Sequence, residues 1–193
     1  MPRAGLDPAT VTETGADLAD EIGFAQLSMS VVAERLGVKT PSLYKHVDGL
    51  ADLSHRIAIL AATEVGEALG TAVDGATGRE ALDGAARALR AYVVQHPGRY
   101  AATVSARPTG PDDALIPARD RVLTALSGAL ADYDLDPADE IHALRMLRSV
   151  LHGFATLEAA DSFQMNTDID ESFTWVITFL DQGLRGRGSA RPV

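Results

Sequence analysis

Apolar residues recur along the chain at the three- and four-residue spacing of amphipathic helices, and no segment alternates apolar and polar residues as a half-buried strand would. Helix-start pairs such as Asp7-Pro8 and Asp136-Pro137, together with glycine and proline stops, divide this pattern into nine segments. The sequence therefore predicts an all-α protein with helices near residues 8–22, 28–36, 40–47, 50–69, 82–93, 100–104, 116–133, 137–159 and 169–184.

The segment from Ser28 to Val47 has the pattern of two short helices joined by a tight turn. Ser28 is placed to cap the first helix, and Ala33 is small enough to let the second helix approach it. Gly37 allows the left-handed backbone that the turn requires, and Leu43 packs the second helix back on the first. This combination specifies a helix-turn-helix, whose second helix can enter the major groove of DNA.

The charge of the chain gives two opposite indications. The formal net charge is −10, with 17 basic and 27 acidic side chains, and a strongly acidic chain argues against nucleic-acid binding. However, residues 35–47 hold three basic residues, His46 and no acid, and the only two lysines of the chain, Lys39 and Lys45, both lie there. A basic cluster can arise by chance, so it supports DNA binding only because it coincides with the second helix.

With these residues in view, the chain resembles the TetR family of transcriptional regulators. The resemblance covers about residues 8–60 and depends on residues 27–38 (LSMSVVAERLGV), residues 41–47 (PSLYKHV) and Leu53, with Leu43-Tyr44-x-His46 as its most specific part. A weaker resemblance, to a C-terminal domain type with a Trp-His-Gly-like signature, depends on residues 151–154 and on Leu157-Glu158.

The resemblance implies an all-helical homodimer, in which three N-terminal helices bind DNA and a long fourth helix connects them to the C-terminal helices. The latter are expected to form a ligand pocket and the dimer interface. On this basis we expect a DNA-binding domain over residues 1–48, a ligand-binding and dimerisation domain over 49–184, and a flexible tail over 185–193.

The expected DNA contacts belong to the two helices of the helix-turn-helix. The resemblance implies that the recognition helix begins at residues 39–42 and that six of its positions face DNA. To these we add Pro41, together with the hydroxyls of Ser28 and Ser30 at the start of the preceding helix. The complete set is Ser28, Ser30, Lys39, Thr40, Pro41, Ser42, Tyr44, Lys45 and His46. We assign Lys39 and Lys45 to bases or phosphates, and Tyr44 and His46 mainly to phosphates. Tyr44 has an alternative interpretation, in which its ring is partly core.

One position departs from the family pattern. Many members have a basic residue at the start of the fourth helix, where this chain has Leu50 with Asp48 nearby. We therefore expect one phosphate contact to be missing, and Arg3 could supply a contact from the minor groove. The acidic body predicts weak non-specific binding that depends strongly on salt.

The candidate ligand pocket and dimer interface come from the second half of the chain. Ligand candidates are Tyr92, His96, Tyr100 and Arg107 around the break at Pro97, with His152 and Phe154 from the helix at 137–159, although core packing explains the same residues. The last two helices are apolar over a wide arc, which suits either a core position or a subunit interface. We expect the interface to include Val150, Leu157, Trp175 and Phe179, and we expect His152 and Glu158 to serve mainly as structural polar groups.

Absent residues and motifs exclude other classes. The chain has no cysteine and no apolar stretch near the ~18 residues of a membrane span, and its N-terminus lacks the apolar run of a signal peptide, so we expect a cytoplasmic protein. The five histidines lack metal-ligand spacing, and phosphate-loop and nucleophile motifs are missing, which predicts no metal, no cofactor and no catalysis.

The sequence thus predicts a ligand-responsive regulator, a repressor by family habit, with three partners: a palindromic operator in double-stranded DNA, a small-molecule effector and a second copy of the chain. The alternatives are an acidic interaction module that retains a degenerate helix-turn-helix and, less favoured, a helical-bundle enzyme.

Overall fold

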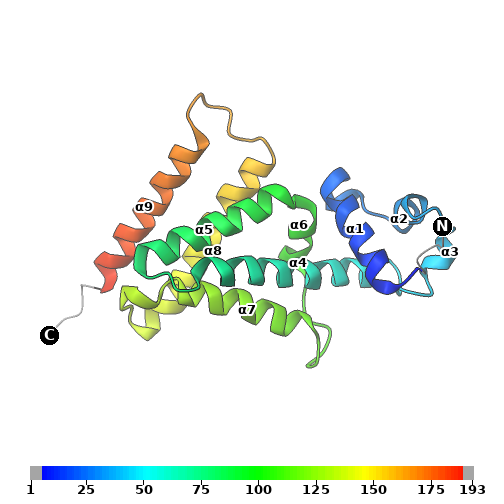
Figure 1. Ribbon diagram of the computed structural model, residues 1–193, viewed down its shortest axis with the longest axis horizontal. Coiled ribbons are helices and arrows are strands. Elements are labelled where there is room, and N and C mark those ends of the chain that lie inside the picture. Colours follow the sequence, from blue (N-terminus) through cyan, green and yellow to red (C-terminus); the bar gives the residue numbers. More distant parts are fainter. Residues whose placement is uncertain (1–5, 189–193) are drawn as a thin grey trace. The chain divides into compact units, whose positions relative to one another are not determined.

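The computed structural model describes residues 6–188, and within that range it contains helices and no strand, as the sequence predicts (Figure 1). The elements are α1 (Pro8–Ile22), η1 (Phe24–Gln26), α2 (Met29–Arg35), α3 (Thr40–Leu43), α4 (Leu50–Val73), α5 (Gly78–Gln95), α6 (Pro97–Ser105), α7 (Leu115–Gly128), η2 (Ala131–Tyr133), α8 (Pro137–Ala159) and α9 (Ile169–Gly188). Within the described residues, no helix is long and apolar enough to cross a membrane.

The predicted helix starts are confirmed by side-chain caps. Asp7 accepts a hydrogen bond from the Thr10 amide at 2.7 Å, and Asp136 accepts one from the Ala138 amide at 2.9 Å. Asp168 accepts from the amides of two residues in the first turn of α9. Each carboxylate satisfies amides that have no partner within their own helix, so the sequence places these boundaries correctly.

Several helix boundaries differ from the sequence prediction. The connection between the helices predicted near 50–69 and 82–93 is shorter than expected, because α4 runs to Val73 and α5 begins at Gly78. The predicted helix over 116–133 is α7 followed by η2, and α9 extends to Gly188, four residues beyond the expected end at residue 184. At Gly188 an added Cβ would lie 2.1 Å from the Tyr133 carbonyl oxygen, so tertiary contact extends α9 despite the glycines at its end.

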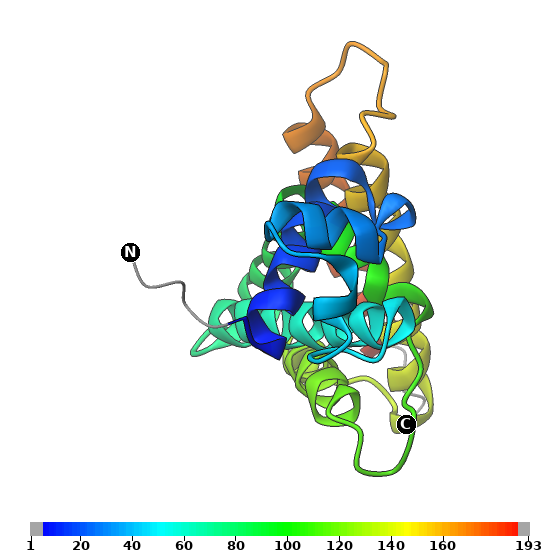
Figure 2. The ribbon, with the colours of Figure 1, turned by 90° about the vertical axis from the view of Figure 1, so that its right-hand side faces the viewer.

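The chain divides into two compact units. The first joins the residues up to Ala62 with His96–Ile116, so α6 and the loop after it belong with α1–α3 and the first half of α4 (Figure 2). Its core is a single cluster that includes Val11 of α1, Leu43 of α3, Leu53 of α4 and Ala102 of α6. On α1, Val11, Leu18 and Ala19 are buried, whereas Ile22 at the end of the helix is exposed.

The second unit comprises residues 63–95 and the chain from Pro117 onward. Helix α5 packs against both α8 and α9, and the fully buried side chains of Leu82, Leu147, Phe173 and Ile177 form its core. Arginines along α5 reach α9, because Arg79 and Arg87 donate to the hydroxyls of Thr178 and Thr174, and Arg90 donates to Asp170.

Candidate nucleic-acid interface

Local hydrogen bonds build the predicted turn between α2 and α3. Ser28 caps α2, since its hydroxyl accepts a weak hydrogen bond from the Val31 amide at 3.4 Å. At the other end the amides of Gly37 and Val38 donate to the carbonyls of Glu34 and Ala33, both at 3.0 Å. Gly37 has φ of +66°, a conformation that side chains strongly disfavour. The glycine therefore sets the angle at which α3 leaves α2.

Helix α3 presents its polar residues outward around an apolar anchor. Leu43 and Val47 are buried in the core, while Lys39, Pro41 and Lys45 are exposed and Thr40, Ser42 and His46 are half-buried. The helix ends at Leu43 and continues only as a turn through residue 46, which is shorter than the predicted segment 40–47.

Tyr44 and the α2 serines occupy accessible positions beside these residues. Tyr44 is 56% exposed, so its ring lies largely at the surface, in agreement with the DNA-facing interpretation rather than a core one. The Ser28 and Ser30 hydroxyls lie 3.0 Å apart at the start of α2, and Ser30 is exposed. The structure thus brings the DNA-contact candidates together on α2, α3 and the turn after α3.

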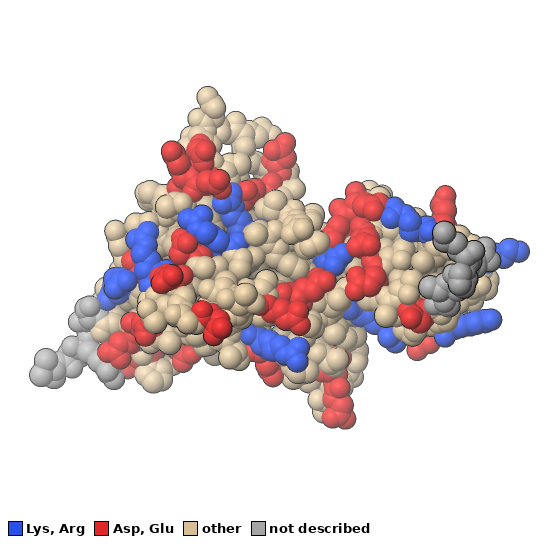
Figure 3. Space-filling model, in the orientation of Figure 1, with Lys and Arg blue, Asp and Glu red and all other residues tan. Residues whose placement is uncertain are grey.

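The basic side chains of this surface differ in whether they already pair with an acid of the protein. Arg35 forms a two-pronged ion pair with Glu21 of α1, and the hydrogen bond from Arg35 lowers the pKa of Glu21. In contrast, among residues 6–188 neither Lys39 nor Lys45 forms an ion pair. Figure 3 shows basic side chains projecting from the region of α2 and α3. The two lysines are therefore ready to bind an external anion.

The start of α4 is less suited to phosphate. Leu50 is 39% exposed, and the Asp52 carboxylate accepts hydrogen bonds from the Asp48 amide and from Arg56. The guanidinium of Arg56 is thus held by an acid of its own helix. Leu50 therefore offers no positive charge to a phosphate. Arg3, the residue suggested to supply a replacement contact, lies outside the described residues.

Helix α6 is joined to α1 by a group of ion pairs centred on the buried Arg99. The Arg99 side chain, only 7% exposed, donates to Asp20 at 2.8 Å and to Asp17 at 2.7 Å, and its amide donates to Asp20. His96 lies 3.1 Å from the same Asp20 carboxylate. At Gly98 the α1 backbone comes so close that a Cβ would overlap the Ala19 carbonyl. We call Asp17, Asp20, His96 and Arg99 the α1–α6 clamp.

The ligand candidates are divided between the units. His96, Tyr100 and Arg107 belong to the first unit, where His96 joins the clamp, Tyr100 is buried and Arg107 donates to the adjacent Ala106 carbonyl. Tyr92 in the second unit is also buried and donates to Glu64 at 2.5 Å. These four side chains therefore have structural partners or core positions.

The α8 candidates have different surroundings. Burial lowers the pKa of His152, so its neutral form is favoured. Phe154 packs against Phe163 and Phe173 with ring centroids 4.8 and 4.9 Å away, and it lines a pocket at the α8–α9 end. Glu158 binds Arg90 with two hydrogen bonds of 2.6 Å, which confirms its structural role.

The interface candidates form an exposed apolar surface on the last two helices. Trp175 and Phe179 are one turn apart on α9, stack with ring centroids 5.6 Å apart, and are 68% and 63% exposed. On α8, Leu157 is exposed and Val150 is half-buried. Large apolar side chains left in water on two adjacent helices are typical of a protein interface.

Sequence reasoning missed three groups of residues. They are the acids and Arg99 of the clamp, the Arg90–Glu158–Asp170 ion-pair group, and the α8–α9 loop residues Phe163 and Met165 around Phe154. Of these residues, only Phe163, the aromatic residue of a mainly polar loop, could have been noticed in the sequence as a candidate pocket residue. The ion pairs join residues 68 to 82 positions apart, and no local pattern indicates such pairs.

The fold contains a helix-turn-helix, and comparison with known proteins identifies the class and the family. Residues 82–180 match the tetracyclin repressor-like, C-terminal domain family. The HTH-type transcriptional regulator Rv0681 of Mycobacterium tuberculosis is 32% identical over 185 residues, covering 95% of this chain and 84% of the relative. The HTH-type transcriptional regulator YobS of Bacillus subtilis is 29% identical over 181 residues, 93% of each chain.

Similarity to a solved structure agrees. A TetR variant of Acinetobacter baumannii AYE in complex with minocycline has a TM-score of 0.68 and 22% identity, covering 94% of this chain and 98% of that one. The chain therefore belongs to the TetR family of transcriptional regulators, and the predicted family is confirmed. The family and the curated relatives are transcriptional regulators rather than enzymes, so the enzyme alternative is excluded.

Proposed function

We propose that the protein is a homodimeric repressor that binds a palindromic operator and is released by a small molecule. The observation that carries the DNA-binding part is that Lys39 and Lys45 are exposed on either side of α3 and form no ion pair within residues 6–188, while Leu43 anchors α3 in the core. In this proposal residues 1–48 read DNA, with Thr40, Ser42, Tyr44 and His46 beside the lysines. Residues 49–184 bind the effector and the second subunit.

Replacing Lys45 with alanine should weaken operator binding about tenfold and reduce the slope of log affinity against log salt by about 1, because one phosphate contact is lost. Lys39→Ala should have a similar effect, or a sequence-dependent one if Lys39 contacts a base. The measurement is a gel shift with a selected operator at two salt concentrations and competitor DNA. The control is Arg145→Ala, which removes an exposed cation of α8 without affecting α3.

The gel shift also tests the interaction-module alternative. The exposed Leu50 and the acidic body favour that alternative. If the wild-type chain shows no specific, salt-weakened binding to any selected site, the interaction module is the correct interpretation. If the Lys45→Ala protein binds the operator as tightly as the wild type, Lys45 does not contact DNA.

The dimer part of the proposal depends on the apolar α8–α9 surface. Two reading heads must lie about 34–36 Å apart to occupy successive major grooves, so a fixed dimer is required for a palindromic site. Trp175→Glu or Phe179→Glu should convert the dimer to monomers, because a buried unpaired carboxylate in the interface costs several kcal/mol. Light scattering after gel filtration measures the mass.

Leu123→Glu is the matched control for this change. Leu123 is an exposed leucine of α7, outside the proposed interface, and its replacement should leave the dimer intact. A Trp175→Glu protein of unchanged dimeric mass would reject α9 as the interface.

The effector part is supported by the family and by the minocycline that one structural neighbour holds. Effector binding would disturb the spacing of the reading heads and thereby lower operator affinity. A metabolite panel in the gel shift identifies compounds that release DNA.

A further inference from the structure

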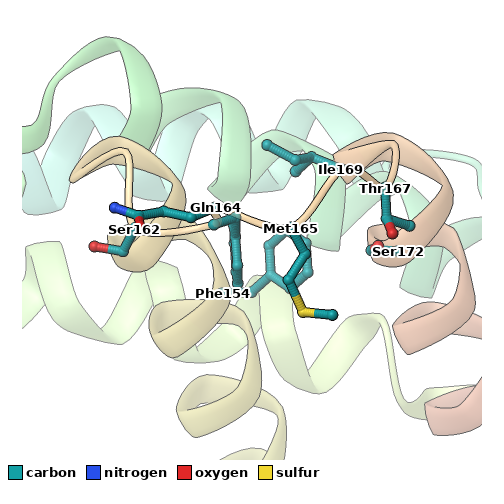
Figure 4. Close-up of a pocket in the computed structure, with 8 residues that line it drawn as sticks. Phe154, Ser162, Gln164, Met165, Thr167, Ile169 and Ser172 are labelled. Carbon is teal, nitrogen blue, oxygen red and sulfur yellow. The ribbon is translucent and has the colours of Figure 1, made fainter.

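A groove lies at the end of the second unit where the loop joins α8 to α9 (Figure 4). It consists of two neighbouring hollows of about 280 and 380 Å³, which share the lining residues Phe154, Thr167 and Ser172. The first extends to Phe163 and Met165, and the second extends along α9 to Trp175, a residue of the proposed dimer interface. We call this continuous feature the α8–α9 groove. Its combined size suits a small molecule.

Phe154, Phe163 and Trp175 line the α8–α9 groove, and the fully buried Phe173 packs against Phe154 from inside the unit. Phe154 packs between Phe163 and Phe173, so three rings form one cluster. The guanidinium of Arg90 lies 4.8 Å from the Phe173 ring centroid and 5.7 Å from that of Phe154. The chain therefore already places one cation on this cluster, since aromatic faces attract positive charge.

Negative charge prevails around the groove. Residues 149–184 contain no Lys or Arg, and the segment 158–171 carries five carboxylates. Arg90 offsets only part of this charge, because a single guanidinium pairs with two of the carboxylates, those of Glu158 and Asp170. Glu171 lines the second hollow, and among the described residues no cation pairs with its carboxylate. An anionic ligand would be repelled here, whereas a cation would gain both the carboxylate and the rings.

We propose that the α8–α9 groove binds a small lipophilic cation, an organic ammonium group carried on an aromatic body. The ammonium lies near Glu171 and the face of an aromatic ring, and the apolar body covers Phe163 and Met165. We further assign this class of cation as the effector of the protein, a step that rests on the regulatory role proposed above.

Direct binding to the full-length protein tests the ligand class independently of DNA. The probes are benzyltrimethylammonium, the similarly sized neutral alcohol dimethylbenzylcarbinol, and the anion hydrocinnamate. Isothermal titration calorimetry gives the affinities. We expect the cation to bind roughly tenfold more tightly than the other two. Equal affinities, a preference for the anion, or no binding by any probe would overturn the proposal.

Two variants locate the site. Glu171→Gln should weaken benzyltrimethylammonium binding roughly fivefold and leave the alcohol unchanged. Glu140→Gln is the matched control, because Glu140 is also an exposed glutamate in the first turn of a helix, here α8. Phe163→Leu keeps an apolar wall but removes a ring, so it should weaken the cation about two- to fivefold more than the alcohol. Losses that are identical for cation and alcohol would reject the assignment.

The gel shift separates this inference from the proposed function. If the cation binds in the groove and releases operator, both stand. If it binds with the stated variant effects but operator affinity is unchanged, the groove remains a cation site and its role as effector site is rejected. If no operator is bound at all, the proposed function fails while the calorimetric result still decides the ligand class.

Discussion

Gly98→Ala is expected to lower the free energy of unfolding by about 3 kcal/mol or more, because helix α6 would have to move away from α1. The added methyl carbon would lie 1.8 Å from the Ala19 carbonyl oxygen and 2.0 Å from its carbon, and both are backbone atoms that cannot rotate away. Separation would also stretch the bonds from Arg99 to Asp17 and Asp20. Urea denaturation followed by circular dichroism measures the loss.

Gly153→Ala provides the matched comparison within a helix. An added Cβ at Gly153 would meet no heavy atom within 4 Å, so alanine should stabilise α8 by about 0.5–1 kcal/mol. Equal stability of the two variants would show that the close approach of α1 to Gly98 is absent in solution. The operator affinity of Gly98→Ala should also fall, since α6 supports the helix-turn-helix core.

Arg90→Met should destabilise the protein by about 3–5 kcal/mol, because removal of the guanidinium leaves the poorly solvated carboxylate of Glu158 without a positive partner. The Arg90 and Glu158 side chains are only 13% and 16% exposed, and hydrogen bonds to Glu158 and then to Asp170 raise the pKa of Arg90. The change also removes the guanidinium that covers the Phe173 ring. Thermal and urea unfolding curves measure this effect.

Arg87→Met is the control, since Arg87 is an exposed arginine one turn earlier on α5 that pairs with Asp83. Exposed pairs of this kind contribute about 0–1 kcal/mol. In the double variant Arg90→Met with Glu158→Gln, part of the loss should be recovered, because the buried negative charge is gone. Additive losses would contradict the explanation by an unpaired carboxylate.

The local features of the fold could be predicted from the sequence because each is specified by a few neighbouring residues. Gly37 determines the turn by its backbone freedom, and Asp7 and Asp136 fix helix starts by their caps. The buried anchor Leu43 and the exposed Lys39 follow from the periodicity of a short helix. The same reasoning placed the end of α9 too early, because the contact of Gly188 with Tyr133 is not visible in the sequence.

The features that depend on distant residues could not be predicted. Arg99 contacts Asp20 across 79 positions, and His96 was interpreted as a ligand candidate because its neighbours in space were unknown. Phe154 was identified as a pocket residue, but Phe163 was missed because the loop between α8 and α9 has no periodic pattern that orients it. Trp175 was assigned to the dimer interface from the wide apolar arc of its helix, and its exposure agrees with a position outside the core.

The scarcity of lysine has a chemical consequence for this protein. Only two ε-amino groups exist in the chain, and both are solvent-accessible on or beside α3. An acylating reagent that spares guanidinium therefore modifies these two amines and the α-amino group alone. Each acylation removes one positive charge from a protein that carries a formal charge of −10, so a mild covalent treatment would remove charge at the proposed DNA-contact surface and leave the ion pairs formed by arginine untouched.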